Sequence, residues 1–303
     1  MSGSVGSAYY SIRNVKRNTV QKFSGSKEKH EKLEPMLRWC VTTGLAAGPS
    51  LTEAVLKGAL EIIERDAFMI SYLRFISPSR LDIENLAKHN EQIKVVLNKL
   101  KRYNLKLDLL KLPTDAPVYA IAAVITDKTG IGPAVTVGAK ADFNLTECVL
   151  GATGEALVNR PNIRGKWAVG KTISNHRQLD KEGRLLYWSE PNNRKKLDFF
   201  ISGELNTPDT TKWSLATTNT TERLKILVDY FSHTKQEFCY VKLSNRQLEQ
   251  AGFWVIKAVV PTMHPLHLHE SIPYHYSERL FSVPKKLKLE TTDKINTEPH
   301  PFP

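Results

Sequence analysis

The sequence predicts an α+β fold, an α/β sandwich of helices packed on sheets. Three features support this class. A helical pattern runs without Pro from residue 50 to residue 68. Three runs rich in apolar and β-branched residues then follow close together, bounded by Pro and Gly, at 106–112, 118–126 and 134–140. A strand–helix–strand order returns between residues 238 and 260.

The composition describes a globular chain without a membrane segment. Of its 303 residues, 41% are hydrophobic, which suffices for the core of one large or two modest domains. No apolar run approaches the length of a membrane span, and no signal peptide opens the chain. Cys40, Cys148 and Cys239 lie far apart in no metal-binding spacing, so we expect a reducing compartment. We predict a cytoplasmic protein that contacts no membrane.

The formal net charge of +12 at pH 7 restricts the choice of partners. A basic balance suits nucleic acid, an acidic peptide or polyphosphate. The Lys and Arg residues are spread along the chain, without the clustering and interleaved aromatic residues of a nucleic-acid surface. We therefore predict no nucleic-acid binding. We expect the positive electrostatic field of the chain to attract an acidic leader peptide or partner subunit instead.

Composition also suggests where the folded part begins. Residues 1–36 are polar and basic, with a Gly/Ser-rich opening and the run SGSKEKHEKLE, which is typical of an arm or linker. We place the folded domain at residues 37–303. A charged linker from Lys285 to Asn296 leads to the tail Pro299-His300-Pro301-Phe302-Pro303, a Pro-x-Pro-x-Pro pattern.

The helix after Gly48 carries carboxylates along one side. Ser50 is the expected N-cap, and Glu53 stands three residues later in the position of a capping box. At about 100° per residue, one stripe contains Glu53, Lys57, Glu61, Glu64 and, at its edge, Arg65. The opposite side is apolar and is expected to be buried. It contains Val55, Leu56, Ala59, Ile62, Ile63, Met69 and Ile70.

Two interpretations of this stripe compete. In the first it is a solvated face, with Glu53–Lys57 and Glu61–Arg65 as i,i+4 ion pairs. In the second it is a magnesium–nucleotide site, because Mg²⁺ prefers oxygen ligands and usually takes one or two carboxylates plus phosphate oxygens. Glu61 and Glu64, one turn apart, would then each hold a metal, and the planar fork of Arg65 would meet a phosphate.

The remaining elements follow in order. We expect a second amphipathic helix over 81–103, then the three strands, with a turn at 127–130 between the last two. Asn144 is the expected N-cap of a helix that ends at Arg160. The later elements are expected as short helices at 177–188 and 195–203, a helix at 222–234, strands at 238–243 and 253–260, and a short helix at 245–251.

Histidines gather after the last predicted strand. A metal site there would use His267 and His269 with Glu270 or His275, but the spacing matches no zinc signature, so we expect a polar loop. Arg279 follows and is interpreted either as a ligand of phosphate or substrate, or as part of a surface salt bridge.

The carboxylate helix resembles a signature of the YcaO family. In that signature a Gly-x-Ala-x-Gly turn precedes Glu-Ala and then Glu-x-x-Glu-Arg. The chain has Gly44-Leu45-Ala46-Ala47-Gly48, then Glu53-Ala54, then Glu61-Ile62-Ile63-Glu64-Arg65. YcaO proteins that form azolines also end in a Pro-x-Pro-x-Pro tail whose terminal carboxylate enters the active site. The chain therefore resembles the cyclodehydratase called the D protein, with a YcaO-like fold of mixed sheets packed with helices.

This resemblance implies an ATP-dependent peptide cyclodehydratase with ATP and Mg²⁺ as cofactors. It assigns Glu61, Glu64 and Glu155 to metal, Glu53 to nucleotide or metal, Arg65 and Arg160 to phosphate, and the Pro303 carboxylate to a catalytic or positioning role. Cys, Ser or Thr of a ribosomal precursor peptide would become thiazoline or oxazoline through phosphorylation of the amide oxygen. The implied partners are that peptide, a leader-binding E1-like subunit and a flavin dehydrogenase, with a homodimer as a further possibility.

The chain departs from the family pattern in places. An earlier signature with a Gly-Lys-rich turn and another Glu-x-x-Glu-Arg helix is missing, so the chain looks shortened at its N-terminal side. Ala46 and Pro49 replace residues that donate hydrogen bonds. A further family signature, a helix bearing Glu-x-x-Gln-x-Arg, is matched at its Glu and Arg places by Glu155 and Arg160, but Val158 stands where Gln is expected. Two alternatives therefore stay open, a non-catalytic YcaO-like scaffold subunit and a relative that forms thioamides or amidines with ATP.

Overall fold

The computed structural model describes most of the chain beyond residue 40. The described residues are 41–168, 179, 181–209, 213–215, 218–267, 270 and 273–302. Residues 1–40 and 41–303 form separate units, and all the described residues belong to the second unit. Within the described ranges, no helix combines the length and the apolar character needed to cross a membrane.

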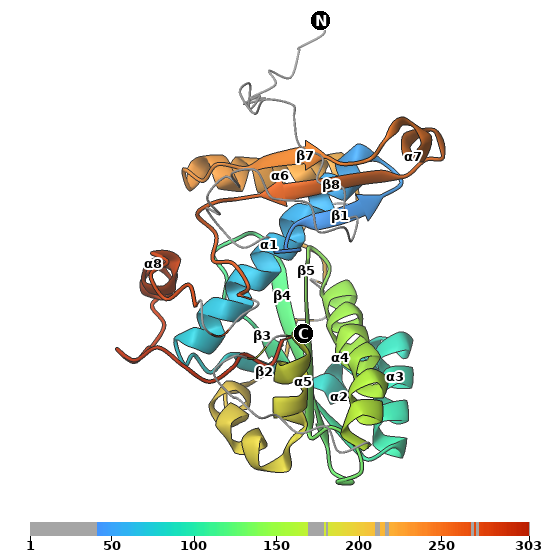
Figure 1. Cartoon of the computed structure of the whole chain (residues 1–303), viewed down its shortest axis with the longest axis vertical. Helices are drawn as coiled ribbons and strands as arrows, with labels where there is room; N and C mark the ends of the chain where they lie inside the picture. Colours follow the sequence, from blue (N-terminus) through green and yellow to red (C-terminus); the bar gives the residue numbers. More distant parts are fainter. Residues whose placement is uncertain are drawn as a thin grey trace, which may run out of the picture. The chain divides into compact units, whose positions relative to one another are not determined.

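The second unit contains two β-sheets and a set of helices (Figure 1). The strands are β1 (Leu45–Gly48), β2 (Ser79–Leu81), β3 (Leu105–Lys111), β4 (Tyr119–Asp127), β5 (Val135–Asp142), β6 (Leu205–Asn206), β7 (Cys239–Lys242) and β8 (Trp254–Val259). The helices are α1 (Leu51–Leu73), α2 (Ile83–His89), α3 (Glu91–Arg102), α4 (Leu145–Ala168), α5 (Lys181–Ser189), the 3₁₀ helix η1 (Pro191–Ile201), α6 (Thr220–His233), α7 (Arg246–Gln250) and α8 (Arg279–Lys286).

The two sheets differ in size and pairing. The larger has five strands in the order β5-β4-β3-β2-β6, antiparallel except for the parallel pair β2 and β6. The smaller has three antiparallel strands in the order β1-β8-β7. Sheets and helices together confirm the predicted α+β class. Among the described strands β5 forms one edge of the larger sheet, so half of its backbone N–H groups have no partner strand there.

The larger sheet is buried on both faces. Along β4, alternate side chains point into two different cores. Ile121, Ala123 and Ile125 point into a core shared with α2, α3 and α4. The residues between them, such as Ala122 and Val124, point into a second core shared with α1 and the smaller sheet. Because successive strand residues face opposite sides, one strand serves both cores.

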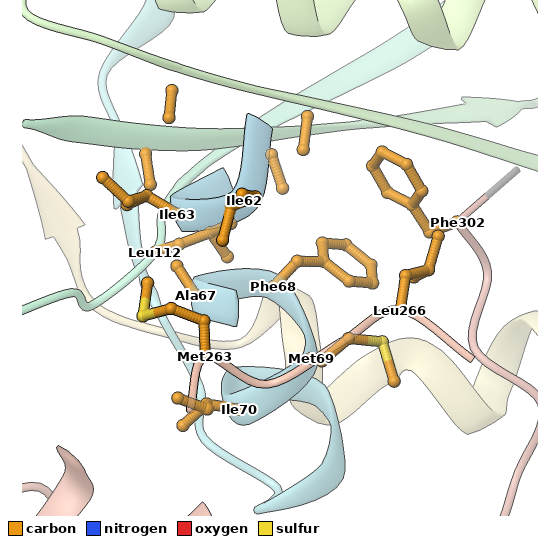
Figure 2. Packing of buried hydrophobic residues seen from close by; sticks show 14 of the residues in the cluster. Ile62, Ile63, Ala67, Phe68, Met69, Ile70, Leu112, Met263, Leu266 and Phe302 are labelled. Atoms are coloured by element: carbon orange, nitrogen blue, oxygen red, sulfur yellow. The ribbon is translucent and has the colours of Figure 1, made fainter. Parts of the chain in front are cut away.

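Helix α1 is the central element of the second core. Its start is confirmed, because the Ser50 side chain accepts a hydrogen bond from the N–H of Glu53 (3.1 Å). It packs on β1 and β8 of the smaller sheet and on β4 and β5 of the larger one. Figure 2 shows apolar side chains of α1, including Ile63, Phe68 and Ile70, inside this core. The predicted apolar side is buried throughout.

Some elements differ from the prediction. The helix expected over 81–103 is two helices, because the Asn90 side chain accepts a hydrogen bond from the N–H of Ile93 and caps a new helix start. The helix capped by Asn144 passes Arg160 and continues to Ala168 with Pro161 inside it. Arg279–Lys286, whose last two residues fall inside the expected linker, is helical.

Candidate functional site

Three glutamates from two helices surround one arginine. Glu61 and Glu64 lie on α1, and Glu155 lies on α4. The Oε1 atoms of Glu61 and Glu155 are 3.5 and 3.8 Å from Arg65 Nη2, and Oε1 of Glu64 is 3.5 Å from Arg65 Nε. The structure therefore brings together four of the residues that the sequence assigned to metal and phosphate.

The edge strand β5 fixes two of these carboxylates. The N–H of Ala141 donates to Oε2 of Glu64 (3.2 Å), and the N–H of Ala139 donates to Oε2 of Glu155 (2.9 Å). Alternate residues of an edge strand direct their N–H groups to the same side. The strand thus supplies two amides at a fixed spacing, and each carboxylate keeps its other oxygen for the site.

A glycine before β1 fixes the third carboxylate. The N–H of Gly44 donates to Oε2 of Glu61 (3.0 Å). Gly44 has a φ of +84°, a conformation that side chains disfavour, and a Cβ there would collide with the carbonyl oxygen of Ala258. The glycine turn of the quoted signature is therefore needed for backbone geometry at the site.

Arg65 has unused hydrogen-bonding capacity. Its side chain is 12% exposed, and among the described residues no acceptor completes a hydrogen bond to its Nε or Nη1 atoms. Buried donors without acceptors are unfavourable, and a phosphate oxygen would satisfy them. Three carboxylates around one guanidinium also leave excess negative charge, which fits a divalent cation with oxygen ligands. The residues present therefore fit a Mg²⁺–phosphate group.

Burial controls the charge of Glu64. The residue is 4% exposed, and this burial raises its pKa to about 7. Arg65 and Lys140 oppose the shift, while the carboxylates of Glu155 and Glu61 add to it. A bound cation would favour the ionised form for the same electrostatic reason that Arg65 does.

The C-terminal tail folds back to this site. Arg65 Cζ lies 3.8 Å from the centroid of the Phe302 ring, and the Phe302 ring meets the Phe68 ring edge-on at 4.9 Å between centroids. Figure 2 shows the Phe302 ring opposite Phe68, beside Leu266. Pro303, the predicted catalytic residue, lies outside the described residues.

Backbone and side-chain bonds fasten the tail along α1. The N–H of Asn296 donates to the carbonyl of Leu73 (2.8 Å). The carbonyl of Pro299 accepts from the hydroxyl of Tyr72 and from Nε1 of Trp188, both at 3.0 Å. These buried hydrogen bonds determine the path of the tail and therefore the position of Phe302.

Glu53 lies apart from the three carboxylates. It stands in the first turn of α1 and pairs with Lys57 at 2.7 Å. This is the ion pair expected for a solvated face, and the Glu61–Arg65 pair of the same interpretation also forms. A nucleotide role for Glu53 stays a prediction.

Arg160 occupies a different place on α4. Its Nη2 atom contacts Oδ2 of Asp127 at 2.5 Å, and its Nη1 atom donates to the carbonyl of Pro133. Five residues along a helix correspond to a rotation of about 140° from Glu155. Arg160 therefore lines a separate cavity of about 710 Å³ that it shares with Arg164. Its phosphate role stays a prediction.

The histidine segment packs against the tail. Ligand atoms of His267, Glu270 and His300 lie within 4.8 Å of one another, while His269 lies outside the described residues. The fully buried Arg184 donates to the carbonyl of His267 (2.9 Å) and to Glu270 (3.3 Å). A guanidinium at this distance opposes a second cation. No spacing in the sequence indicated that His300 would join this group.

Arg279 is neither a surface residue nor part of the carboxylate site. Its Nε and Nη2 atoms donate to both oxygens of Asp66 (2.7 and 2.6 Å), and Nη2 also donates to Asp115 (2.8 Å). Asp66 additionally accepts from the N–H of His264. Arg279 therefore forms a salt bridge, as one sequence interpretation expected, but the pair is buried and joins α8 to α1 instead of lying on the surface.

Comparison with known protein families gives a match over most of the chain. Residues 23–264 match the family model described as "YcaO cyclodehydratase", ATP- and Mg²⁺-binding. The chain belongs to the YcaO family. The resemblance drawn from the glycine turn and the Glu-x-x-Glu-Arg helix is thereby confirmed, and the match begins before the described residues.

Solved structures share the YcaO fold at low sequence identity. A heterocyclase in complex with substrate and cofactor is 22% identical, with a TM-score of 0.70 over 90% of this chain and 35% of that one. YcaO from Methanopyrus kandleri bound with AMPPCP and Mg²⁺ is 22% identical, with a TM-score of 0.56 over 76% and 57%. The E. coli microcin synthetase McbBCD complex with pro-MccB17 bound is 17% identical, with a TM-score of 0.61 over 87% and 63%.

The matches also differ from this chain in length. An uncharacterized protein in the tfuA 3′ region of Rhizobium leguminosarum bv. trifolii is 39% identical over 85 residues, which are 27% of this chain and 20% of that protein. The YcaO chain described here therefore spans only about a third of the heterocyclase and a fifth of this curated relative.

Proposed function

We propose that this YcaO chain binds ATP with Mg²⁺ at the cluster of Glu61, Glu64, Glu155 and Arg65, and uses it to cyclodehydrate a ribosomal precursor peptide. One observation carries the proposal. Each of the three carboxylates has one oxygen on a backbone N–H and the other directed at Arg65. Preorganised oxygens beside an arginine are what phosphoryl transfer requires of a protein.

The residues are proposed to have different roles according to their chemistry. The three glutamates would hold Mg²⁺, and the fork of Arg65 would hold a phosphate. The metal, when bound, neutralises phosphate charge and orients the transferred group. Glu53 and Arg160 are proposed as further contacts to nucleotide or metal and to phosphate. They lie outside the cluster, so their contribution depends on the bound nucleotide reaching them.

The reaction is the closing of an azoline ring. The side chain of Cys, Ser or Thr adds to the preceding amide carbonyl, and the resulting oxygen takes the γ-phosphoryl group of ATP, releasing ADP. That oxygen then leaves as phosphate while the amide nitrogen loses its proton and forms the C=N bond. Pro303 is proposed to act here through its carboxylate, as a base or a positioning group, because Phe302 next to it already reaches Arg65.

Partners belong to the same proposal. The McbBCD structure is a complex with a precursor peptide bound, which supports a precursor peptide and partner subunits for this chain as well. We propose a leader-binding E1-like subunit and a flavin dehydrogenase, and we leave the homodimer as a further possibility.

The test uses the full chain with a precursor peptide and its partner subunit. We expect ATP hydrolysis that depends on the peptide, and loss of one water mass per ring formed. The change Glu64→Gln keeps the size of the side chain and removes a metal ligand, so turnover should fall at least about a hundredfold. Glu91→Gln, the same change at an exposed residue of α3, should leave turnover unchanged. Equal activity of both variants would contradict the proposal.

A non-catalytic scaffold is the second candidate. Its support is that Arg65 lies within 4 Å of all three carboxylates and so compensates part of their charge without any metal. A wild-type chain that binds no nucleotide with Mg²⁺, yet still assembles with the partner subunit, would favour this reading. A peptide that gains sulfur or closes an amidine would instead indicate the thioamide- or amidine-forming relative.

A further inference from the structure

We infer that Phe302 is a positioning residue for Arg65, and that its aromatic face keeps the guanidinium in the orientation that receives phosphate. The inference rests on the proposed function, because it concerns how Arg65 meets a nucleotide. The contact that suggests it is direct. Arg65 Cζ lies 3.8 Å from the centroid of the Phe302 ring, well inside the range of a cation–π interaction.

The ring has a fixed place. Phe302 is fully buried and packs edge-on against Phe68, whose ring meets Phe200 in the same manner. The preceding tail is tied down at Pro299, and the Nε2 atom of His300 lies 2.8 Å from the carbonyl oxygen of His267. A ring held from several sides can fix the position of a guanidinium that sits at the end of a long, rotatable side chain.

The three carboxylates explain why such a ring is useful. Nε and Nη2 of Arg65 already face them at 3.5 to 3.8 Å. Without a further constraint, the guanidinium would turn to make closer hydrogen bonds with these oxygens and would no longer be available to phosphate. A ring that covers one face of the guanidinium leaves its edges free, and among the described residues Nη1 has no hydrogen-bond acceptor. The ring thus favours the arrangement in which one edge faces carboxylates and another is open.

Burial by itself does not explain the choice of an aromatic residue. Phe200 is equally buried and packs on the same Phe68 ring at 5.5 Å between centroids, but among the described residues no Lys or Arg side chain lies over its face. The two phenylalanines therefore form a matched pair, one with a cation and one without.

The experiment replaces Phe302, in the full chain, by phenylalanine carrying one, two or three ring fluorines. Fluorine withdraws electron density from the ring face and changes the size of the side chain little, so it weakens a cation–π contact stepwise. We expect the dissociation constant of AMPPCP with Mg²⁺ to rise at each step, by about tenfold over the series. The same series at Phe200 should leave that constant unchanged.

A second measurement does not depend on nucleotide. The Nε–Hε resonance of Arg65 should be shifted by the ring current of Phe302, and Phe302→Leu should abolish this shift. A normal Arg65 resonance in the wild-type chain, or equal effects of fluorine at positions 302 and 200, would overturn the inference. A wild-type chain that binds no AMPPCP while Arg65 shows the ring-current shift would overturn the proposed function and the phosphate role of Arg65. Retained binding that Arg65→Lys weakens, with no fluorine effect, would overturn the inference alone.

Discussion

The carboxylate of Glu64 accepts a hydrogen bond from the backbone N–H of Ala141, 3.2 Å away and 77 residues later in the chain. This bond joins the central helix α1 to the edge strand β5. Two residues earlier on the same strand, Ala139 holds Glu155 in the same way. The candidate site is therefore built on the unpaired edge of a sheet, and its geometry depends on how closely α1 and α4 approach that edge.

The first prediction concerns the approach of α4 to β5. A Cβ at Gly138 would lie 2.5 Å from the N atom of Ala156 and 2.8 Å from Cβ of Glu155. Gly138→Ala must therefore displace α4, and we expect it to lower the free energy of unfolding by about 1–3 kcal/mol. Because Glu155 moves with the helix, nucleotide binding should weaken as well. Chemical denaturation and calorimetry with AMPPCP measure the two effects.

Gly154 provides the matched control on α4 itself. A Cβ there meets nothing within 4 Å, and alanine favours helix over glycine by about 0.5–1 kcal/mol. Gly154→Ala should therefore raise the free energy of unfolding and leave nucleotide binding unchanged. Destabilisation by Gly154→Ala, or none by Gly138→Ala, would show that α4 does not pack as described.

A second prediction concerns the buried ion pair of Asp66 and Arg279. Arg279→Met would leave Asp66 buried without its cation, which costs about 3–5 kcal/mol of unfolding free energy. Lys57→Met removes the partner of Glu53 in an exposed pair and should change stability by less than about 1 kcal/mol. If the two changes proved equally mild in denaturant titrations, the assignment of Arg279 to the core would be refuted.

A third prediction concerns stability in acid. Burial lowers the pKa of His264 to about 3 and that of His300 well below its usual value. Between pH 6.5 and pH 3 the unfolded chain binds more protons at His264 than the folded chain does, so stability falls as pH falls. At pH 5 His264 costs about 2 kcal/mol relative to pH 7.5, and His300 acts in the same direction.

Single variants isolate this effect from the other groups that titrate. His264→Gln should reduce the loss of unfolding free energy between pH 7.5 and pH 5, whatever its effect at pH 7.5. His89→Gln, at an exposed position on α2, should leave the slope almost as it is in the wild type. Identical slopes for wild type and His264→Gln would mean that His264 is protonated in the folded chain.

The sequence was informative where structure depends on neighbours along the chain. The capping box at Ser50, the apolar side of α1 and the strands near 106–140 follow from local spacing, and all are present. The spacing of Glu61 and Glu64 likewise placed two carboxylates one turn apart. Only the family signature connected Glu155 to them, because no local pattern relates α4 to α1.

Contacts between distant segments account for what the sequence left unpredicted. The stripe on α1 was expected to face water or a ligand, yet Glu64 is buried because β5 passes next to it. Asp66 lies among apolar residues, and a carboxylate buried there requires a buried cation as its partner. The partner, Arg279, is 213 residues away in sequence. The contact of Phe302 with Arg65 depends on the path of the tail, which no periodicity encodes.

The central claim is that Glu61, Glu64 and Glu155 hold a divalent cation beside Arg65. Crystals of the chain grown with Mn²⁺ and AMPPCP would test it directly through the anomalous scattering of manganese. We predict a manganese peak in contact with the Oε1 atoms of these glutamates, with a phosphate oxygen on Arg65, and its loss in Glu64→Gln. Nucleotide bound elsewhere, or manganese absent from the three carboxylates, would contradict the claim.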